Sequence, residues 1–290
     1  MQNNPLPMNP IRGILLMNLA MFLLAGMDSI TKTLATEYAV PQILSVRFLI
    51  FCVFALAIAR PKSLRAAFSS KHPYLQIARS LIIVVEVGVF IVAFRYLPLA
   101  DAHAISGIAP LLVTALAVPF LGEKVGLRRW SAIAIGFIGL LVIVRPGLGV
   151  FNPAALIPLA GACLWAVYQI LVRKVSDDSA ATSLLYMAFI GAIVMTCLAP
   201  FFWRAPDATG WLLLFALGVV GSLGHYILIK AFQFAPVSTL QPFHYIVLLW
   251  ATVFGYTVFG DLPDMWTILG AAIIAGSGLY AFYREQRAKH

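Results

Sequence analysis

The chain has 290 residues, of which 62% are hydrophobic and only 11% are charged, and its formal net charge is +9. A soluble domain of this length carries about a quarter charged residues, so the composition excludes an ordinary soluble enzyme and a disordered chain. In a membrane protein the positive charge follows from basic cytoplasmic loops, and no nucleic-acid partner is expected.

Ten apolar segments, separated by charged residues, proline or glycine, predict an all-α polytopic membrane protein. Several of the gaps between them are too short to hold a domain, so we expect nearly the whole chain to lie in the lipid bilayer. In chain order the predicted transmembrane helices are residues 11–34, 42–60, 74–95, 99–121, 128–145, 153–173, 181–202, 210–233, 237–259 and 264–283.

The basic residues predict how the chain is oriented in the membrane. If the N-terminus is cytoplasmic, 15 of the 20 Lys and Arg residues fall on the inner side of the membrane and 5 on the outer side. Basic residues are enriched in cytoplasmic loops. We therefore expect a multi-pass protein of the cytoplasmic (inner) membrane, with both termini in the cytoplasm.

The sequence repeats itself at an offset of 138 residues, about half its length. Ala93–Leu99 matches Ala231–Val237, and Phe120–Glu123 matches Val258–Asp261. Each half has five predicted spans, and because five is odd, the second half must enter the membrane from the opposite side. Inverted repeats are typical of secondary transporters, which bind their substrate near the midplane. The predicted five-helix repeats are residues 11–147 and 152–284.

Several motifs resemble those of EamA-type members of the drug/metabolite transporter superfamily, over nearly the whole chain. The resemblance implies ten helices in two inverted halves, around a central cavity lined mainly by spans 1, 3, 4, 6, 8 and 9. Two stretches, Ala25–Lys32 and Gly221–Tyr245, look nearest to the bacterial S-adenosylmethionine-uptake branch. The motifs that carry the resemblance are Arg47–Phe48, Leu99–Ala102, Pro110–Leu111, Leu121–Glu123, Trp130, Gly136–Gly139 and Arg145–Gly147.

Two ionisable residues lie near the middle of their spans, where a charge is costly without a partner or a function. Glu86 is in span 3, and its counterpart at the repeat offset, Gly224, is next to His225 in span 8. Both side chains are therefore expected to face one cavity, where they are candidates for proton coupling. The alternative for each is a structural hydrogen bond to a neighbouring helix.

Three further ionisable residues lie in spans 1 and 2. Asp28 and Lys32 are four residues apart, on one helical face, and either form a local ion pair or contact a charged or zwitterionic substrate. Arg47 either extends to the membrane interface or pairs with Glu37, and we expect a structural role for it.

Polar and aromatic residues at helical spacing complete the predicted substrate cavity. His103 in span 4 has Gln241 as its counterpart in span 9, and the alternative for this group is interhelical hydrogen bonding. Aromatic rings in spans 6 and 8 suit a flat or cationic solute, although they are equally common in helix packing. The predicted cavity residues besides Asp28, Lys32, Glu86, His103 and His225 are Trp165, Tyr168, Gln169, Tyr226, Gln241, His244 and Tyr245.

Glu123 and Asp261 occupy corresponding ends of spans 4 and 9, on opposite faces of the membrane. Salt bridges from these carboxylates would make Glu123 and Asp261 gate residues. Arg47 is a further candidate for a helix-end or gate residue. A solvated helix end is the simpler interpretation of each acidic residue.

These features predict a secondary active transporter that moves a small polar or amphipathic metabolite, such as an amino acid or nucleoside-like solute, by alternating access. Proton or exchange coupling is left open. The alternatives are an S-adenosylmethionine uptake carrier, a passive facilitator or channel, and, least favoured, an intramembrane enzyme. The sequence has neither an HExxH nor a G-x-S-x-G motif. We expect no catalytic residues, cofactor or metal. The expected partners are the solute and the lipid bilayer, and the expected state is a monomer or weak homodimer.

Overall fold

The computed structural model describes residues 9–59, 68–122, 126–145, 152–175, 178–234, 240 and 243–288. The described residues form helices and no strands, as predicted. Their bounds are α1 (Pro10–Ala35), α2 (Val40–Ala59), α4 (Pro73–Tyr96), α5 (Leu99–Ser106), α6 (Ala109–Leu121), α7 (Leu127–Val144), α8 (Leu156–Lys174), α9 (Ala180–Leu198), α10 (Ala208–Phe234), α12 (Ile246–Phe259) and α13 (Met265–Ala288), with short 3-10 turns at Pro153–Ala155 and Ala199–Phe202.

Seven of the described helices are long and apolar enough to cross a membrane, and three shorter apolar helices accompany them. The chain is therefore a multi-pass membrane protein, whereas the number of ten crossings stays a prediction. Many large apolar side chains, such as Val53, Leu127 and Phe201, are exposed on the outside of the bundle. In a bilayer these side chains face the hydrocarbon, which explains why so few charged residues suffice for the surface.

The predicted fourth span is broken into two helices. Gly107 and Ile108 form a turn between α5 and α6, and Pro110 lies in the first turn of α6. Proline has no backbone N–H and is therefore tolerated at the start of a helix but not in its interior. The break leaves the end of α5, with Ser106, next to the helices that surround the centre of the bundle.

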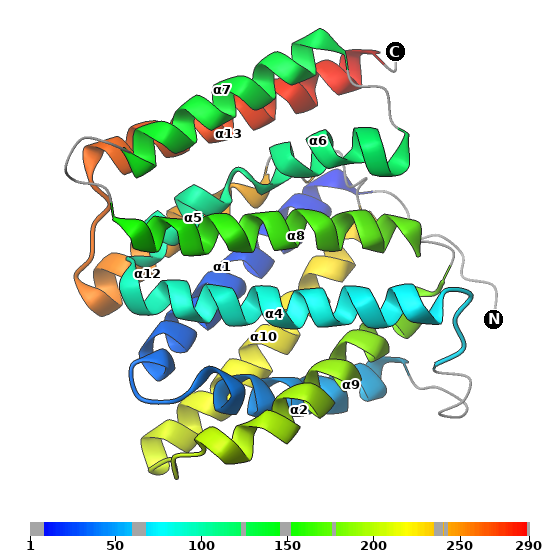
Figure 1. The fold of residues 1–290 in the computed structure, drawn as a ribbon, viewed down its shortest axis with the longest axis vertical. Helices are drawn as coiled ribbons and strands as arrows, with labels where there is room; N and C mark the ends of the chain where they lie inside the picture. Colours follow the sequence, from blue (N-terminus) through cyan, green and yellow to red (C-terminus); the bar gives the residue numbers. More distant parts are fainter. Residues whose placement is uncertain are drawn as a thin grey trace.

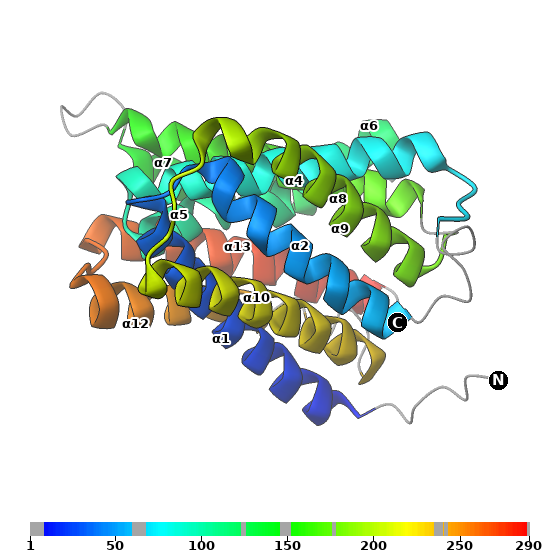
Figure 2. The ribbon, with the colours of Figure 1, turned by 90° about the horizontal axis from the view of Figure 1, so that it is seen from below.

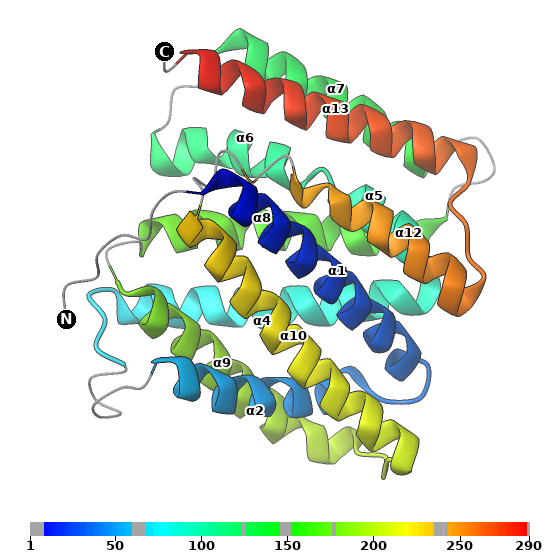
Figure 3. The same cartoon turned by 180° about the vertical axis from the view of Figure 1, so that it is seen from behind.

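The helices are arranged in two layers. α4 and α8 lie side by side in one layer, and α1, α10 and α12 cross behind them in the other (Figure 1, Figure 3). α2 pairs with α9 at one edge of the molecule, and α7 pairs with α13 at the opposite edge (Figure 1). Figure 2, seen from below, shows α2 between α9 and α10.

The packing of the two halves follows a two-fold pattern. In the repeat, α1 corresponds to α8, α2 to α9 and α4 to α10. The contact of α1 with α10 therefore has its counterpart in that of α8 with α4, and the contact of α2 with α10 in that of α9 with α4. The ends of α6 and α12 repeat as well: Gly122 (φ 69°) and Gly260 (φ 73°) both cap their helix in the left-handed conformation, 138 residues apart. Glycine adopts this conformation without steric cost.

At the edge formed by α7 and α13, the two helix backbones approach closely. A Cβ atom on Gly139 would lie 2.8 Å from the carbonyl oxygen of Gly270, and one on Gly270 would lie 2.5 Å from that of Gly139. Small residues allow this approach in membrane helices, where van der Waals packing replaces the hydrophobic effect. The pair α7–α13 is therefore tightly joined across the two halves.

Candidate functional site

Three ionisable side chains from α1, α2 and α4 form the centre of the candidate site. Glu86 in α4 is 7% exposed, and its charged neighbours are Arg47 in α2 and Asp28 in α1. Arg47 interacts electrostatically with both carboxylates. It therefore lies within the bundle, rather than pairing with the exposed Glu37 or reaching the membrane interface. We call Asp28, Arg47 and Glu86 the charge cluster.

Two histidines adjoin the charge cluster. His103 in α5 places its Nε2 atom 3.1 Å from the Asp28 Oδ2 atom, and its ring packs between Phe90 and Phe94 of α4, with centroids 6.3 and 5.9 Å away. His225 in α10 interacts electrostatically with Arg47 and Asp28. The predicted residues Glu86 and His225 thus share the same charged neighbours, although they come from different halves of the chain.

Lys32 pairs with the second half of the chain and not with Asp28. Its Nζ atom lies 2.8 Å from the Asp261 Oδ2 atom and 4.6 Å from the centre of the Phe259 ring. The alternative of a local ion pair between Asp28 and Lys32 is therefore wrong, because Asp28 lies against His103 and Lys32 reaches the loop after α12. Asp261, which was expected to be a solvated helix end or a gate, is bonded across the two halves.

A second ion pair joins the halves at the same end of the bundle, where α1 ends and α13 begins. Arg145, after α7, lies 2.5 Å from Asp264 in the loop before α13. Partial burial acts to raise the pKa of Asp264, but hydrogen bonds from Thr267 and Arg145 outweigh it and hold the pKa below its ordinary value. We call the pairs Lys32–Asp261 and Arg145–Asp264 the ionic bridge.

At the other end of the bundle, where α1 and α4 begin, a hydrogen-bonded group joins the halves. Asp178, between α8 and α9, accepts hydrogen bonds from the Ser70 hydroxyl, the Gln76 Nε2 atom (2.9 Å) and the Lys71 backbone N–H (2.8 Å). These bonds, that from Ser70 first, lower the pKa of Asp178 to about 2. We call Asp178, Ser70 and Gln76 the hydrogen-bonded bridge.

Arg79 extends the hydrogen-bonded bridge towards the centre of the bundle. It is 3% exposed, and it donates to the Tyr168 hydroxyl (3.1 Å) and to the Ser183 carbonyl oxygen (2.6 Å). Tyr168 interacts electrostatically with Glu86 in turn. Arg79 is not among the site residues predicted from the sequence. An arginine inside the apolar span 74–95 was the available signal.

The predicted aromatic residues fall into two groups. Trp165 and Tyr168 pack together on α8, with ring centroids 5.4 Å apart, and Gln169 beside them is partly buried. Tyr226 on α10 instead packs against Phe54 of α2, with centroids 6.0 Å apart. The single aromatic cavity expected from the sequence is therefore divided between α8 and α10.

The residues before α12 lie near His103. His244 interacts electrostatically with His103, so the inward ends of predicted spans 4 and 9 do meet. The Tyr245 hydroxyl is buried, has no hydrogen-bond partner among the described residues and lies against Gly278 of α13. Gln241 and Glu123 lie outside the described residues.

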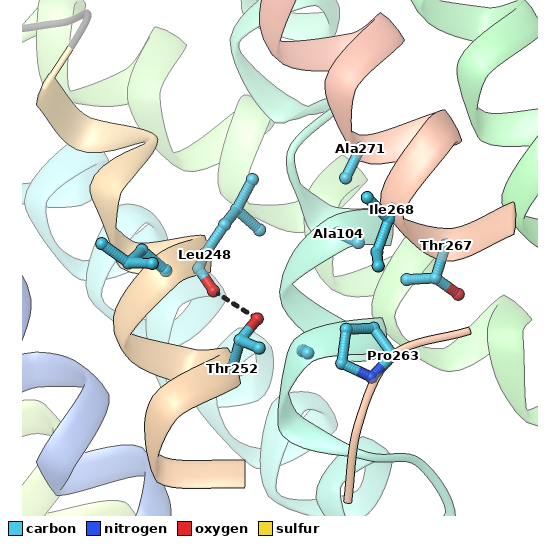
Figure 4. Close-up of a pocket in the computed structure, with 9 residues that line it drawn as sticks. Ala104, Leu248, Thr252, Pro263, Thr267, Ile268 and Ala271 are labelled. Atoms are coloured by element: carbon cyan, nitrogen blue, oxygen red, sulfur yellow. Dashed lines mark hydrogen bonds between the residues drawn. The ribbon is translucent and has the colours of Figure 1, made fainter. Parts of the chain in front are cut away.

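A pocket between α5, α12 and α13 lies apart from the charge cluster (Figure 4). Its volume is about 180 Å³, and it is lined mainly by apolar side chains, including Leu248, Pro263 and Ile268. Of its two threonines, Thr252 donates its hydroxyl to the Leu248 carbonyl oxygen at 2.9 Å, drawn as a dashed line in Figure 4. The polar groups predicted to bind a solute are elsewhere.

Comparison with known proteins gives consistent results. The model of the EamA-like transporter family matches residues 11–145 and 152–283. An S-adenosylmethionine uptake transporter of Rickettsia felis is 32% identical over 220 residues, which cover 76% of this chain and 75% of the relative. A riboflavin transporter of Vibrio cholerae is 31% identical over 271 residues, covering 92% and 91% of the two chains. A solved crystal structure shares the fold with a TM-score of 0.66 at 18% identity, covering 95% of this chain and 98% of that one.

Proposed function

Because the chain belongs to the EamA-like transporter family, we propose that it is a secondary active carrier that moves a small polar or amphipathic metabolite by alternating access. The observation that carries the proposal is the charge cluster. Ionisable groups inside a membrane protein are costly and mark solute or ion pathways. Here three of them meet between α1, α2 and α4, with His225 from the second half beside them.

The bridges between the two halves support the alternating-access part of the proposal. The ionic bridge joins the halves at one end of the bundle, and the hydrogen-bonded bridge joins them at the other. A carrier must open one end while the other stays closed. We propose that the two bridges break in turn, and that the two halves, residues 11–147 and 152–284, rock about the charge cluster.

The same proposal places the protein in the cytoplasmic membrane with both termini in the cytoplasm. The distribution of Lys and Arg supports this orientation. The ionic bridge then faces the outside of the cell, and the hydrogen-bonded bridge faces the cytoplasm. We propose a monomer or weak homodimer as the working state.

S-adenosylmethionine uptake is the second candidate function. Relatives with that name are 30–32% identical to the chain. The riboflavin transporter of Vibrio cholerae is 31% identical to the chain, so other metabolites remain candidate solutes.

Counterflow into liposomes tests the proposal. Purified protein is reconstituted into vesicles preloaded with one unlabelled solute, and uptake of the same labelled solute is followed for S-adenosylmethionine, riboflavin and a set of amino acids and nucleosides. A carrier gives saturable counterflow with at least one of them, whereas a channel gives uptake that neither saturates nor responds to preloading. The absence of saturable uptake for every solute would refute the proposal.

Two substitutions test whether transport is coupled to protons through Glu86 and His225, at the centre of the site. We expect Glu86→Gln and His225→Ala each to lower counterflow at least tenfold or to abolish its dependence on pH. Exposed Glu37→Gln is the matched control and should behave like the unchanged protein. If both central variants kept the uptake rate and its pH dependence, the coupling part of the proposal would be wrong.

A further inference from the structure

A second pocket lies between α2, α9 and α10, which run side by side at one edge of the bundle (Figure 1). Its volume is about 100 Å³, less than that of a site for a whole drug-sized ligand, so it can hold only part of a solute. Aromatic rings from two helices form much of its wall: Phe51 and Phe54 of α2, and Tyr226 of α10. Ser222 and His225 of α10 supply its central polar groups.

Ser222 is a buried hydroxyl that lacks a hydrogen bond. Its side chain is 3% exposed, lines the pocket, and has no hydrogen-bond partner among the described residues. Other helical hydroxyls here bond to the carbonyl four residues earlier, as Ser80 does to Gln76 (2.7 Å) and Thr252 to Leu248 (2.9 Å). Buried polar groups are nearly always satisfied, so this hydroxyl points to a missing ligand.

His225 supplies a hydrogen-bond acceptor beside Ser222. Its Nδ1 atom lies 2.8 Å from the Gly221 carbonyl oxygen, and because a carbonyl only accepts, Nδ1 carries the hydrogen. In the neutral ring the Nε2 atom is then an acceptor. The ring itself packs 6.0 Å from Phe51.

His225 also connects the pocket to the charge cluster, because it interacts electrostatically with Arg47 and Asp28. Aromatic walls favour planar rings, which stack or meet edge to face.

We propose that the pocket between α2, α9 and α10 is a subsite for a planar aromatic group of the transported solute, one that carries an N–H or O–H donor. The donor faces the His225 Nε2 atom, and the Ser222 hydroxyl bonds to a second polar atom of the same ring system. This inference rests on the proposed carrier function, and it adds Ser222, His225 and the aromatic wall as the residues that select the ring.

Binding by the full chain in detergent micelles tests the subsite without requiring transport. The probes are adenosine, riboflavin and tryptophan, each compared with an analogue whose N–H donor on or attached to the ring system is methylated: N6,N6-dimethyladenosine, 3-methylriboflavin and 1-methyltryptophan. Ribose serves as the probe without a ring. We expect at least one ring to bind measurably, its methylated analogue to bind about tenfold more weakly because one hydrogen bond is lost, and ribose not to bind.

The matched variants are Ser222→Ala and Ser277→Ala. Both serines are buried, but Ser277, in α13, already donates to the Ile274 carbonyl oxygen at 2.8 Å. Ser222→Ala should weaken binding of the parent ring about tenfold, and Ser277→Ala should leave it unchanged. Phe54→Leu, which keeps the pocket apolar but removes one ring, should also weaken binding.

The outcomes separate this inference from the proposed function. If no ring binds, or if methylation and Ser222→Ala have no effect, the subsite is refuted even where counterflow is saturable. If the rings bind as expected but no solute shows counterflow, the subsite stands as a binding site and the carrier function fails. Equal weakening by Ser222→Ala and Ser277→Ala would indicate a general loss of structure and also refute the selective role of Ser222.

Discussion

Arg47 is the residue on which the buried electrostatics depend. It lies beside two carboxylates, Asp28 and Glu86, and its positive charge offsets their repulsion. A buried charge without a nearby opposite charge is costly, so the loss of Arg47 should destabilise the folded protein. The sequence alone did not predict the charged neighbours of Arg47, because they come from two other helices.

We therefore expect Arg47→Gln to lower the melting temperature of the purified protein strongly, and the double variant Arg47→Gln/Glu86→Gln to recover part of the loss. Glu86→Gln removes one of the two carboxyl groups that Arg47→Gln leaves without a neighbouring positive charge, so less uncompensated charge remains in the bundle. Melting is followed by intrinsic fluorescence in detergent. A double variant that is no more stable than Arg47→Gln would contradict this account of the charge cluster.

Asp178 gives a prediction about pH. Its pKa lies at about 2, below the ordinary value of about 3.9. A lowered carboxyl pKa contributes stability that is complete above the unfolded-state pKa and is lost as the pH falls towards the folded-state pKa. Asp178→Asn should therefore lower the melting temperature by the same amount at every pH between 6 and 8. A difference that shrinks steadily across that range would show that other groups control this end of the bundle.

At the scale of the helix, hydropathy and turn residues predicted most of the fold. Apolar segments of sufficient length, bounded by proline, glycine and charges, become helices because the bilayer interior leaves no other way to bond the backbone. The break between α5 and α6 was not predicted, although Pro110 was a signal for it. The partners of Lys32 and Arg47 could not be predicted from the sequence, because they depend on which helices pack together and not on local spacing.

Glycine caps give a matched prediction at the same scale. Gly260 ends α12 with φ 73° and has open space where a Cβ would lie, so Gly260→Ala adds backbone strain alone, at a cost of about 1 kcal/mol. Gly276 also has open space but lies within α13, so Gly276→Ala should be neutral or stabilising by up to about 1 kcal/mol. Denaturation in mixed micelles measures both. Changes of the same sign would contradict the left-handed cap.

At the scale of the molecule, the proposed function depends on contacts between the halves. The bridges found at both ends of the bundle join residues of the two predicted repeats. The pairing of Lys32 with Asp261 spans 229 residues of sequence. No pattern in a single sequence fixes such a pair, which the packing of α1 against α12 determines.

Cross-linking tests whether these contacts must break during transport. In a background without Cys52, Cys163 and Cys197, cysteines replace Lys32 and Asp261, and a short bis-methanethiosulfonate reagent joins them through two disulfide bonds. We expect counterflow to stop and a reductant to restore it.

The control pair replaces Glu37 and Arg95, which lie in the first half only, near the contact of Arg95 with the Tyr38 carbonyl oxygen (2.7 Å). Cross-linking it should leave counterflow intact. Equal inhibition by both pairs, or by neither, would contradict the role of the ionic bridge.

The two ends of the bundle respond differently to dissolved ions. The ionic bridge consists of opposite charges that are partly exposed, with 36% and 45% of the Asp261 and Asp264 side chains accessible, and added electrolyte screens such pairs. The hydrogen-bonded bridge joins a carboxylate to neutral donors from Ser70 and Gln76, whose attraction is short-ranged and largely insensitive to screening. We therefore expect a rise in ionic strength to weaken the ionic bridge more than the hydrogen-bonded bridge and, in the proposed alternating-access cycle, to favour opening at the end that the ionic bridge closes.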